Sequence, residues 1–227
     1  RTAWVLDHIS SFGRPDVSMI ECFTTLGALA EATSTIALGS LVANAQLRNH
    51  ALLAASATSV QNISGGRFTL GIGAGAAPNS RWGAELRELG LPPLGDIALR
   101  HTNMTKALQV CRDYWSGAAD NMPRPAISPR VIVGVNSVEL AMIATGCADG
   151  MNVRADHPRL GEIINATTAH RSANPEWEVS VWAPWDTALT NPDHPRISQW
   201  RALGVNCVVL VHFGAPDAQE IARTVVH

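Results

Sequence analysis

The sequence predicts an α/β fold built on parallel strands. Short runs rich in β-branched residues alternate with longer amphipathic segments over 227 residues, as expected of repeated strand–helix units. Several of these runs are continuously apolar, which is typical of strands buried on both faces of a parallel sheet. The clearest is Asn206–His212, which reads Asn-Cys-Val-Val-Leu-Val-His.

We expect seven strands, each a short apolar run bounded by turn residues. They are Thr2–Leu6, Ile36–Ala43, Phe68–Ile72, Val131–Val135, Gly150–Val153, Val179–Ala183 and Asn206–His212. The intervening segments predict helices over Met19–Thr33, Ala51–Ile63, Leu99–Trp115, Asn136–Gly146, Pro158–His170 and Ile197–Leu203, with another from about Pro216. Asn136 is expected to cap its helix, with Glu139 completing a capping box. Gly73 to about Asp96 is expected to be a long loop.

Seven strand–helix units fit either a doubly wound sheet or a TIM (β/α)8 barrel. A barrel closes with eight strands and typically takes about 250 residues. The seven units in these 227 residues are one fewer than a closed barrel needs, and the chain begins at Arg1, immediately before a strand. In a barrel we therefore expect the first βα unit to be absent from this chain. No segment resembles a linker, so we expect residues 1–227 to form a single domain.

The composition excludes several classes of protein. Hydrophobic residues make up 46% and charged residues 16%, which is enough apolar material for a large core and too little charge for disorder. The net charge is −2 without a basic cluster, which argues against binding to nucleic acid. No apolar run reaches the roughly 18 residues that a membrane span needs, so we expect no membrane association.

The cysteines and histidines indicate neither a disulfide framework nor a metal site. Cys22, Cys111, Cys147 and Cys207 are far apart and form no CxxC pair, which argues against zinc. The histidines show no ligand spacing, so no metal is expected. A reducing, cytoplasmic location is the simplest interpretation of these cysteines.

Candidate catalytic residues follow the first strand. Asp7 and His8 come where that strand ends, and in a barrel the carboxyl ends of the strands carry the active site. A histidine there exchanges a proton near neutral pH. The alternative is that Asp7 caps the following loop and that His8 packs against it.

A glycine-rich segment, Gly71-Ile-Gly-Ala-Gly75, ends the third strand. Glycines allow backbone to approach a flat ring or a phosphate closely. The long loop that follows argues against a dinucleotide-binding Rossmann motif, in which a helix comes next, and no Walker lysine is present. On the same edge, Asn79 is a polar candidate. Arg154 follows the fifth strand and is a candidate for holding a phosphate, although its spacing alone favours a solvated surface arginine.

Several segments resemble the luciferase-like flavin and deazaflavin oxidoreductases. Trp4-Val-Leu-Asp-His8 resembles the family's second-strand motif, and Ser64-Gly-Gly-Arg-Phe-Thr-Leu-Gly-Ile-Gly-Ala-Gly75 is very similar to its fourth-strand segment. Leu26–Thr33, Ile36–Val42, Ala148–Asn152 and Gly204–Asn206 resemble other parts of the family. The resemblance implies a TIM barrel with its cofactor at the carboxyl ends of the strands.

The resemblance also implies roles for individual residues. The Leu41–Val42 peptide is expected to be cis and to lie against the cofactor ring. His8 would be the catalytic or substrate-facing residue, with Asp7 beside it. The glycine-rich loop with Gly73 and Gly75, and then Asn79, would contact the ring. Val153 and Arg154 would contact the phosphate.

Two departures from the family pattern bear on activity. Some deazaflavin-dependent dehydrogenases carry a glutamate directly after the Gly-x-Gly, where this chain has Ala76. The chain from Trp177 onward is also short for the family.

The resemblance leaves three functions open. The first is an enzyme that uses coenzyme F420, a deazaflavin, to transfer hydride to or from a small organic substrate; Leu-Asp-His favours it, since FMN monooxygenases more often show Glu-His-His. The second is an FMN-dependent monooxygenase of a two-component system. The third is a non-catalytic flavin-binding barrel. The resemblance further implies a homodimer paired through outer helices, and a partner flavin or F420 reductase. The substrate is not readable from the sequence.

Overall fold

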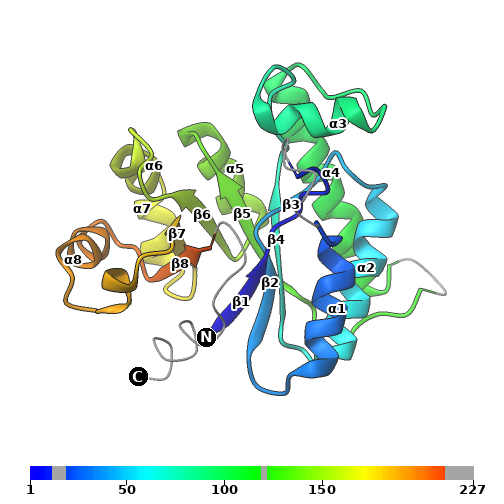
Figure 1. The fold of residues 1–227 in the computed structure, drawn as a ribbon, viewed down its shortest axis with the longest axis horizontal. Helices are drawn as coiled ribbons and strands as arrows, with labels where there is room; N and C mark the ends of the chain where they lie inside the picture. Colours follow the sequence, from blue (N-terminus) through cyan, green and yellow to red (C-terminus); the bar gives the residue numbers. More distant parts are fainter. Residues whose placement is uncertain (12–18, 119–121, 213–227) are drawn as a thin grey trace. The chain divides into compact units, whose positions relative to one another are not determined.

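A computed structural model describes residues 1–11, 19–118 and 122–212 of the chain (Figure 1). The chain falls into two compact units, Arg1–Gly134 and Val135–His227. We refer to them as unit 1 and unit 2 and describe each by itself. The expectation of a single domain over residues 1–227 stays a prediction.

Unit 1 is built on parallel strands. They are β1 (Thr2–Val5), β2 (Ala37–Ser40), β3 (Ala43–Asn44), β4 (Phe68–Gly73) and β5 (Arg130–Val135), of which β5 ends one residue into unit 2. β1 pairs with β2, β2 with β4, and β4 with β5, all in parallel, while the short β3 also pairs with β4. The predicted strands are confirmed to within a residue or two, except that Ile36–Ala43 forms two strands, interrupted at Leu41–Val42.

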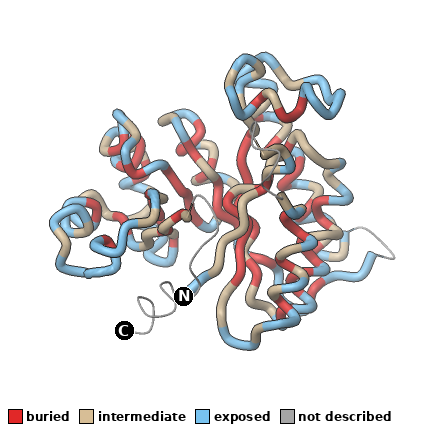
Figure 2. The backbone as a smooth tube through the Cα atoms, in the orientation of Figure 1, coloured by how far each residue is buried: buried red, intermediate tan, exposed pale blue. Residues whose placement is uncertain are grey.

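Three long helices cover the sheet of unit 1: α1 (Cys22–Ala32), α2 (His50–Ile63) and α4 (Ile97–Ser116). α2 contacts both α1 and α4 (Figure 1). The predicted face of α4 is confirmed, since Met104, Leu108, Cys111 and Trp115 are all buried. α4 begins where the Asp96 side chain accepts the N–H groups of Ala98 and Leu99, and it ends at Gly117. Figure 2 shows the sheet and the inner faces of the helices buried together.

The expectation of one long loop from Gly73 to about Asp96 was wrong in its middle part. The segment contains a 3-10 turn, η1 (Arg81–Gly83), and a short helix, α3 (Ala84–Glu88). The Ser80 hydroxyl accepts the Gly83 N–H at 3.0 Å and so starts the turn. A helix of five residues is too short to show helical periodicity in a sequence. α3 nevertheless buries two side chains, Glu85 and Leu86.

The described part of unit 2 contains three parallel strands: β6 (Gly150–Arg154), β7 (Glu178–Pro184) and β8 (Cys207–Val211). β7 pairs with both of the others, with Asn152 opposite Ser180 and Val181 opposite Val208. Its helical segments are α5 (Val138–Cys147), α6 (Leu160–Ala166), α7 (Thr168–Ala173), the 3-10 turn η2 (Thr187–Thr190) and α8 (Pro195–Ala202). All three strands were predicted.

Two helix predictions in unit 2 need correction. The cap of α5 is Ser137 rather than Asn136, because the Ser137 hydroxyl accepts the Leu140 N–H at 3.1 Å. The helix expected over Pro158–His170 is two short helices, which break at Thr167. The helix expected from Pro216 lies outside the described residues.

Among the described helices, none is both long enough and apolar enough to cross a membrane. Within the same residues, no group of three or more His, Cys, Asp or Glu side chains is arranged to hold a metal ion.

Candidate functional site

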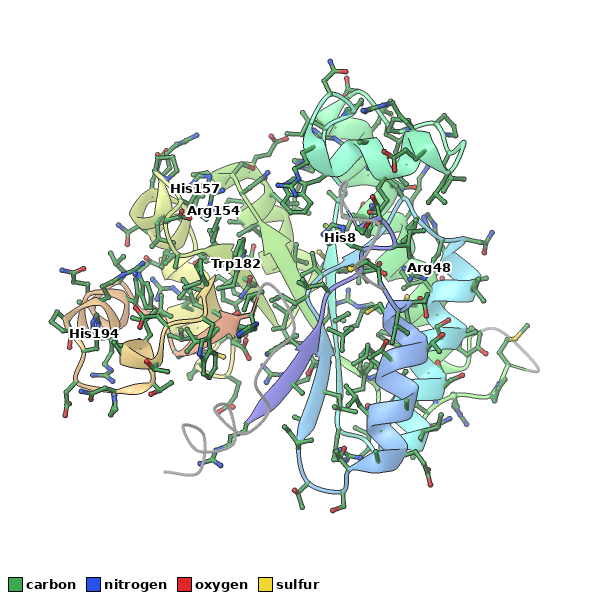
Figure 3. The ribbon with its side chains drawn as sticks, viewed as in Figure 1. His8, Arg48, Arg154, His157, Trp182 and His194 are labelled. Carbon is green, nitrogen blue, oxygen red and sulfur yellow. The ribbon has the colours of Figure 1, made fainter. Side chains whose placement is uncertain are left out.

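The predicted site residues of unit 1 gather at one edge of its sheet. β1, β2, β3 and β4 are parallel, so their carboxyl ends lie at the same edge. Asp7 and His8 follow β1, Leu41 and Val42 follow β2, and Gly73 ends β4. Figure 3 shows His8 and Arg48 at this end of the unit.

Asp7 is held by an arginine that the sequence interpretation missed. Its carboxylate is buried and accepts hydrogen bonds from both terminal nitrogens of Arg48, at 2.6 and 2.7 Å. It also accepts the backbone N–H of Asn44 at 2.8 Å. This forked pair is the arrangement in which arginine binds a carboxylate most strongly. Asp7 therefore ties the end of β1 to β3 and to the segment before α2, rather than capping its own loop.

The same guanidinium reaches a second carboxylate. Arg48 also donates to Glu21, whose side chain caps α1 by accepting the Thr24 N–H at 2.7 Å. Burial would lower the pKa of Arg48, but its hydrogen bonds to Asp7 and Glu21 outweigh burial and raise that pKa above its ordinary value. One guanidinium thus binds two carboxylates at this edge, and the three groups together carry a charge of −1.

His8 lies between a buried glutamate and an aromatic ring. Its Nδ1 is 3.1 Å from Oε2 of Glu85, on α3. Its ring stacks on Trp82 with centroids 5.0 Å apart and planes at 25°. The His8 side chain is 28% exposed and that of Glu85 only 1%, so the imidazole is accessible while its partner is not.

Glu85 also holds the backbone after His8. Its Oε1 accepts the N–H groups of Ile9 and, at 2.8 Å, Ser10. Burial would raise the pKa of Glu85, but the hydrogen bond with His8 and those from Ile9 and Ser10 together bring it below its ordinary value. Glu85 is therefore a carboxylate at neutral pH.

The glycine-rich segment packs against protein atoms. Gly75 has φ +82°, and a Cβ there would lie 2.1 Å from Nε2 of Gln46, so both backbone and space require glycine. Gly73 makes room for Val42, because a Cβ at Gly73 would lie 2.8 Å from a Val42 methyl. That the backbone of Gly73 and Gly75 contacts a cofactor stays a prediction.

Arg100, from the first turn of α4, is a second residue that the sequence interpretation missed. It donates to the Gly75 carbonyl at 3.3 Å. Its Nε is buried and has no hydrogen-bond partner among the described residues. A buried N–H without a partner costs free energy unless something satisfies it, so it marks a place where a bound acceptor would be stabilised.

The Leu41–Val42 peptide bond is cis, as predicted. Leu41 is buried, and the Val42 side chain lies beside the backbone of Gly73 and Gly134. Both residues belong to the same edge as His8.

The remaining predicted site residues are less closely tied to this edge. Asn79 is exposed in the turn before η1. In unit 2, Val153 is buried within β6, and Arg154 ends that strand with its Nε 2.5 Å from Asp156. Arg154 points from the carboxyl end of β6, near His157 (Figure 3). The cofactor contacts of all three stay predictions.

The family follows from comparison with known proteins. The sequence model of the family described as luciferase-like monooxygenase matches residues 1–194. The chain belongs to this family. It is 28% identical over 204 residues to pyrimidine monooxygenase RutA of Bradyrhizobium sp. strain BTAi1, which covers 81% of the chain and 54% of RutA. It is also 28% identical over 162 residues to 5,10-methylenetetrahydromethanopterin reductase of Methanolobus tindarius, which covers 70% of the chain and 47% of the reductase.

A solved structure shows the fold of this luciferase-like chain. It is described as an F420-dependent secondary alcohol dehydrogenase in complex with an F420-acetone adduct. It superposes with a TM-score of 0.72 at 15% identity and covers 92% of this chain and 83% of its own. The predicted fold class, that of the luciferase-like TIM-barrel enzymes, is thereby confirmed. The chain spans about half the length of the two curated relatives.

Proposed function

We propose that this chain is an oxidoreductase that binds coenzyme F420 and transfers hydride to or from a small organic substrate. Members of its family include oxidoreductases and monooxygenases. The observation that carries the finer proposal is the partly exposed imidazole of His8, which Glu85 holds at the edge where β4 ends. A positioned imidazole is what a hydride transfer between carbon and oxygen needs for its proton.

The residues at this edge fit a flat, uncharged ring with carbonyl oxygens. The carboxylates near it are both engaged by protein groups: Asp7 is paired with Arg48, and Glu85 accepts hydrogen bonds from the backbone after His8. The buried Nε of Arg100 offers a donor beside Gly75. Arg100 and the backbone from Gly73 to Gly75 would hold the ring, and Val42 would pack beside it.

His8 would handle the proton of the reaction. Bound F420 supplies the hydride donor or acceptor. When an alcohol is oxidised, the imidazole accepts the hydroxyl proton as the carbon loses its hydride; in the reverse direction it returns that proton to the oxygen. Since Asp7 is already bound by Arg48 and Asn44, its part is to hold the backbone in place for His8.

An FMN-dependent monooxygenase is the second candidate. RutA, a curated relative, is named as a monooxygenase. In that case a partner flavin reductase would supply reduced flavin, and the same edge would hold the ring.

A non-catalytic flavin-binding barrel is the third candidate. Some deazaflavin dehydrogenases carry a glutamate at the position of Ala76, and the absence of that glutamate favours the non-catalytic candidate.

A fluorescence titration separates these candidates. Trp82 stacks on His8 and is 44% exposed, so a chromophore bound at this edge should quench its emission. We expect F420 to quench at lower concentration than FMN. The Trp82→Phe variant should lose most of the F420-dependent quenching while retaining the other tryptophans. Quenching by FMN alone would contradict the F420 proposal and support the FMN-dependent monooxygenase. Quenching by neither compound would reject both cofactors.

A matched pair of arginine variants tests the phosphate contact proposed for Val153 and Arg154. Arg154→Ala should weaken F420 binding by about 1.5–3 kcal/mol, the worth of a hydrogen bond to a charged group. Arg159→Ala is the control, because Arg159 also pairs with a neighbouring carboxylate, Glu162, and lies in the same unit. Equal affinity of both variants, measured by calorimetry, would show that Arg154 is only a surface residue.

We propose that the chain forms a homodimer through the outer face of α1 and α2. A groove of about 490 Å³ runs between these helices, and Leu52 and Ile63 beside it are 58% and 49% exposed. Light scattering at micromolar concentration should give the mass of a dimer, and Leu52→Glu should give that of a monomer. Met142→Glu, at an equally exposed position on α5, should stay dimeric. A wild-type monomer would contradict the proposal.

The cytoplasmic location also stays a proposal. It rests on the four cysteines, which form no disulfide among the described residues. Cys22 and Cys111 are buried, and burial raises the pKa of the Cys111 thiol to about 12, so it is unreactive at neutral pH.

A further inference from the structure

Glu85 makes hydrogen bonds that restrict both the ring of His8 and the backbone that follows it. Oε1 accepts two backbone N–H groups, those of Ile9 and Ser10. Oε2 faces Nδ1 of His8 at 3.1 Å. The side chain is almost fully buried and comes from α3, 77 residues further along the chain. The carboxylate therefore fixes the loop after His8 and the imidazole at once.

The protonation state of Glu85 decides which nitrogen of His8 carries the proton. An ionised carboxylate accepts hydrogen bonds and donates none. The pKa of Glu85 lies below its ordinary value, despite burial, because His8, Ile9 and Ser10 all donate to it. Its hydrogen bond with Nδ1 therefore requires a proton on Nδ1. In a neutral imidazole the lone pair is then on Nε2.

The ring of His8 is also held in its plane. Trp82, three residues before Glu85, stacks on it with planes at 25°. Turning the imidazole over about its Cβ–Cγ bond would put the carbon Cδ2 where Nδ1 now lies, and it would break the contact with Glu85 at 3.1 Å. The stacked Trp82 ring and the buried Glu85 carboxylate thus both restrict rotation of the His8 ring about its Cβ–Cγ bond.

We propose that Glu85 is a positioning residue that holds neutral His8 in the tautomer protonated on Nδ1, so that Nε2 is the nitrogen that exchanges a proton with the substrate. The part that concerns the substrate rests on the proposed function. The part that concerns the tautomer rests only on Glu85 and its partners. A mere anchor of the loop would explain the bonds to Ile9 and Ser10, but it would leave the tautomer of His8 unaffected.

The decisive variant is Glu85→Gln, which has nearly the same size. Its amide oxygen can still accept from Ile9 and Ser10, but the other end of the amide is a donor. That donor requires an acceptor on Nδ1, so neutral His8 must move its proton to Nε2. Glu88→Gln is the matched control, because Glu88 is an exposed residue of the same helix.

The experiment reads the ¹⁵N shifts of the two ring nitrogens of His8, without cofactor, at a pH where the imidazole is neutral. We expect a protonated Nδ1 in the wild type and in Glu88→Gln, and a protonated Nε2 in Glu85→Gln. The amide shifts of Ile9 and Ser10 report whether the loop is intact. A protonated Nε2 in the wild type would overturn the proposal, even if Glu85→Gln failed to fold. An unchanged tautomer in a folded Glu85→Gln would overturn it as well.

Turnover with F420 then tests the link to catalysis. Glu85→Gln should lower turnover by a factor of about 10²–10⁴, as loss of a positioned acid–base group does. The double variant His8→Ala with Glu85→Gln should be no slower than His8→Ala, because residues that act through one another are not additive. A further loss in the double variant would contradict action through His8. If the wild type showed no turnover with F420, the proposed function would fail while the tautomer result stood.

Discussion

Replacing His8 with alanine should lower turnover by a factor of about 10²–10⁴, the usual worth of a positioned acid–base group. The affinity for F420 should stay nearly unchanged. The ring would be held by the backbone from Gly73 to Gly75 and by Arg100, and the variant alters none of these. Turnover is followed by the visible absorbance of F420. Small alcohols and ketones are the first substrates to test, because the proposed proton transfer runs between His8 and a substrate oxygen.

The control for His8 is His50→Ala, since His50 opens α2 in the same unit and has not been assigned to the site. It should turn over as the wild type does. Normal turnover by His8→Ala would show that His8 is a packing residue against Trp82 and that the proton is handled elsewhere.

The largest effect on stability is expected from Arg48→Met. Asp7 is buried and Arg48 is largely shielded from solvent, with side chains 0% and 10% exposed. Removing the arginine leaves the carboxylate of Asp7 buried without its counter-charge, which costs about 3–5 kcal/mol. The free energy of unfolding in urea measures this cost.

Two further variants identify the cause of the loss at Arg48. Lys106→Met, at an exposed position on α4, should change the free energy of unfolding by no more than about 0.5 kcal/mol. Adding Asp7→Asn to Arg48→Met should restore part of the stability, because the neutral amide no longer needs a counter-charge. A cost for Arg48→Met below about 1 kcal/mol, as for an exposed pair, would contradict the buried ion pair.

The strands could be predicted from the sequence because burial on both faces leaves an unmistakable apolar run. Phe68–Ile72 and Gly150–Val153 are examples, and each lies within a residue of its strand in the structure. Helix ends were less certain. Ser137 and Asn136 are both good caps in a sequence, and only the bond to Leu140 decides between them.

The sequence names some residues of the candidate site, and those that it misses share a physical cause. His8 and the cis Leu41–Val42 bond follow from resemblance in short, continuous motifs. Glu85 and Arg48 act through contacts with residues 77 and 41 positions away, which no local pattern records. Glu85 also lies on a helix too short for its periodicity to be visible. The sequence therefore predicts the group that we propose for proton exchange but not the groups that hold it.

The most direct test of the account is a titration of ¹⁵N-labelled protein with F420, read at the backbone amides. The account predicts shifts at Gly73 and Gly75, at the carboxyl end of β4, and at His8. Gly65 and Gly66, which precede β4 at the opposite edge of the sheet, should not shift. Shifts confined to Gly65 and Gly66, or no shifts at saturating F420, would contradict a deazaflavin site at this edge of unit 1.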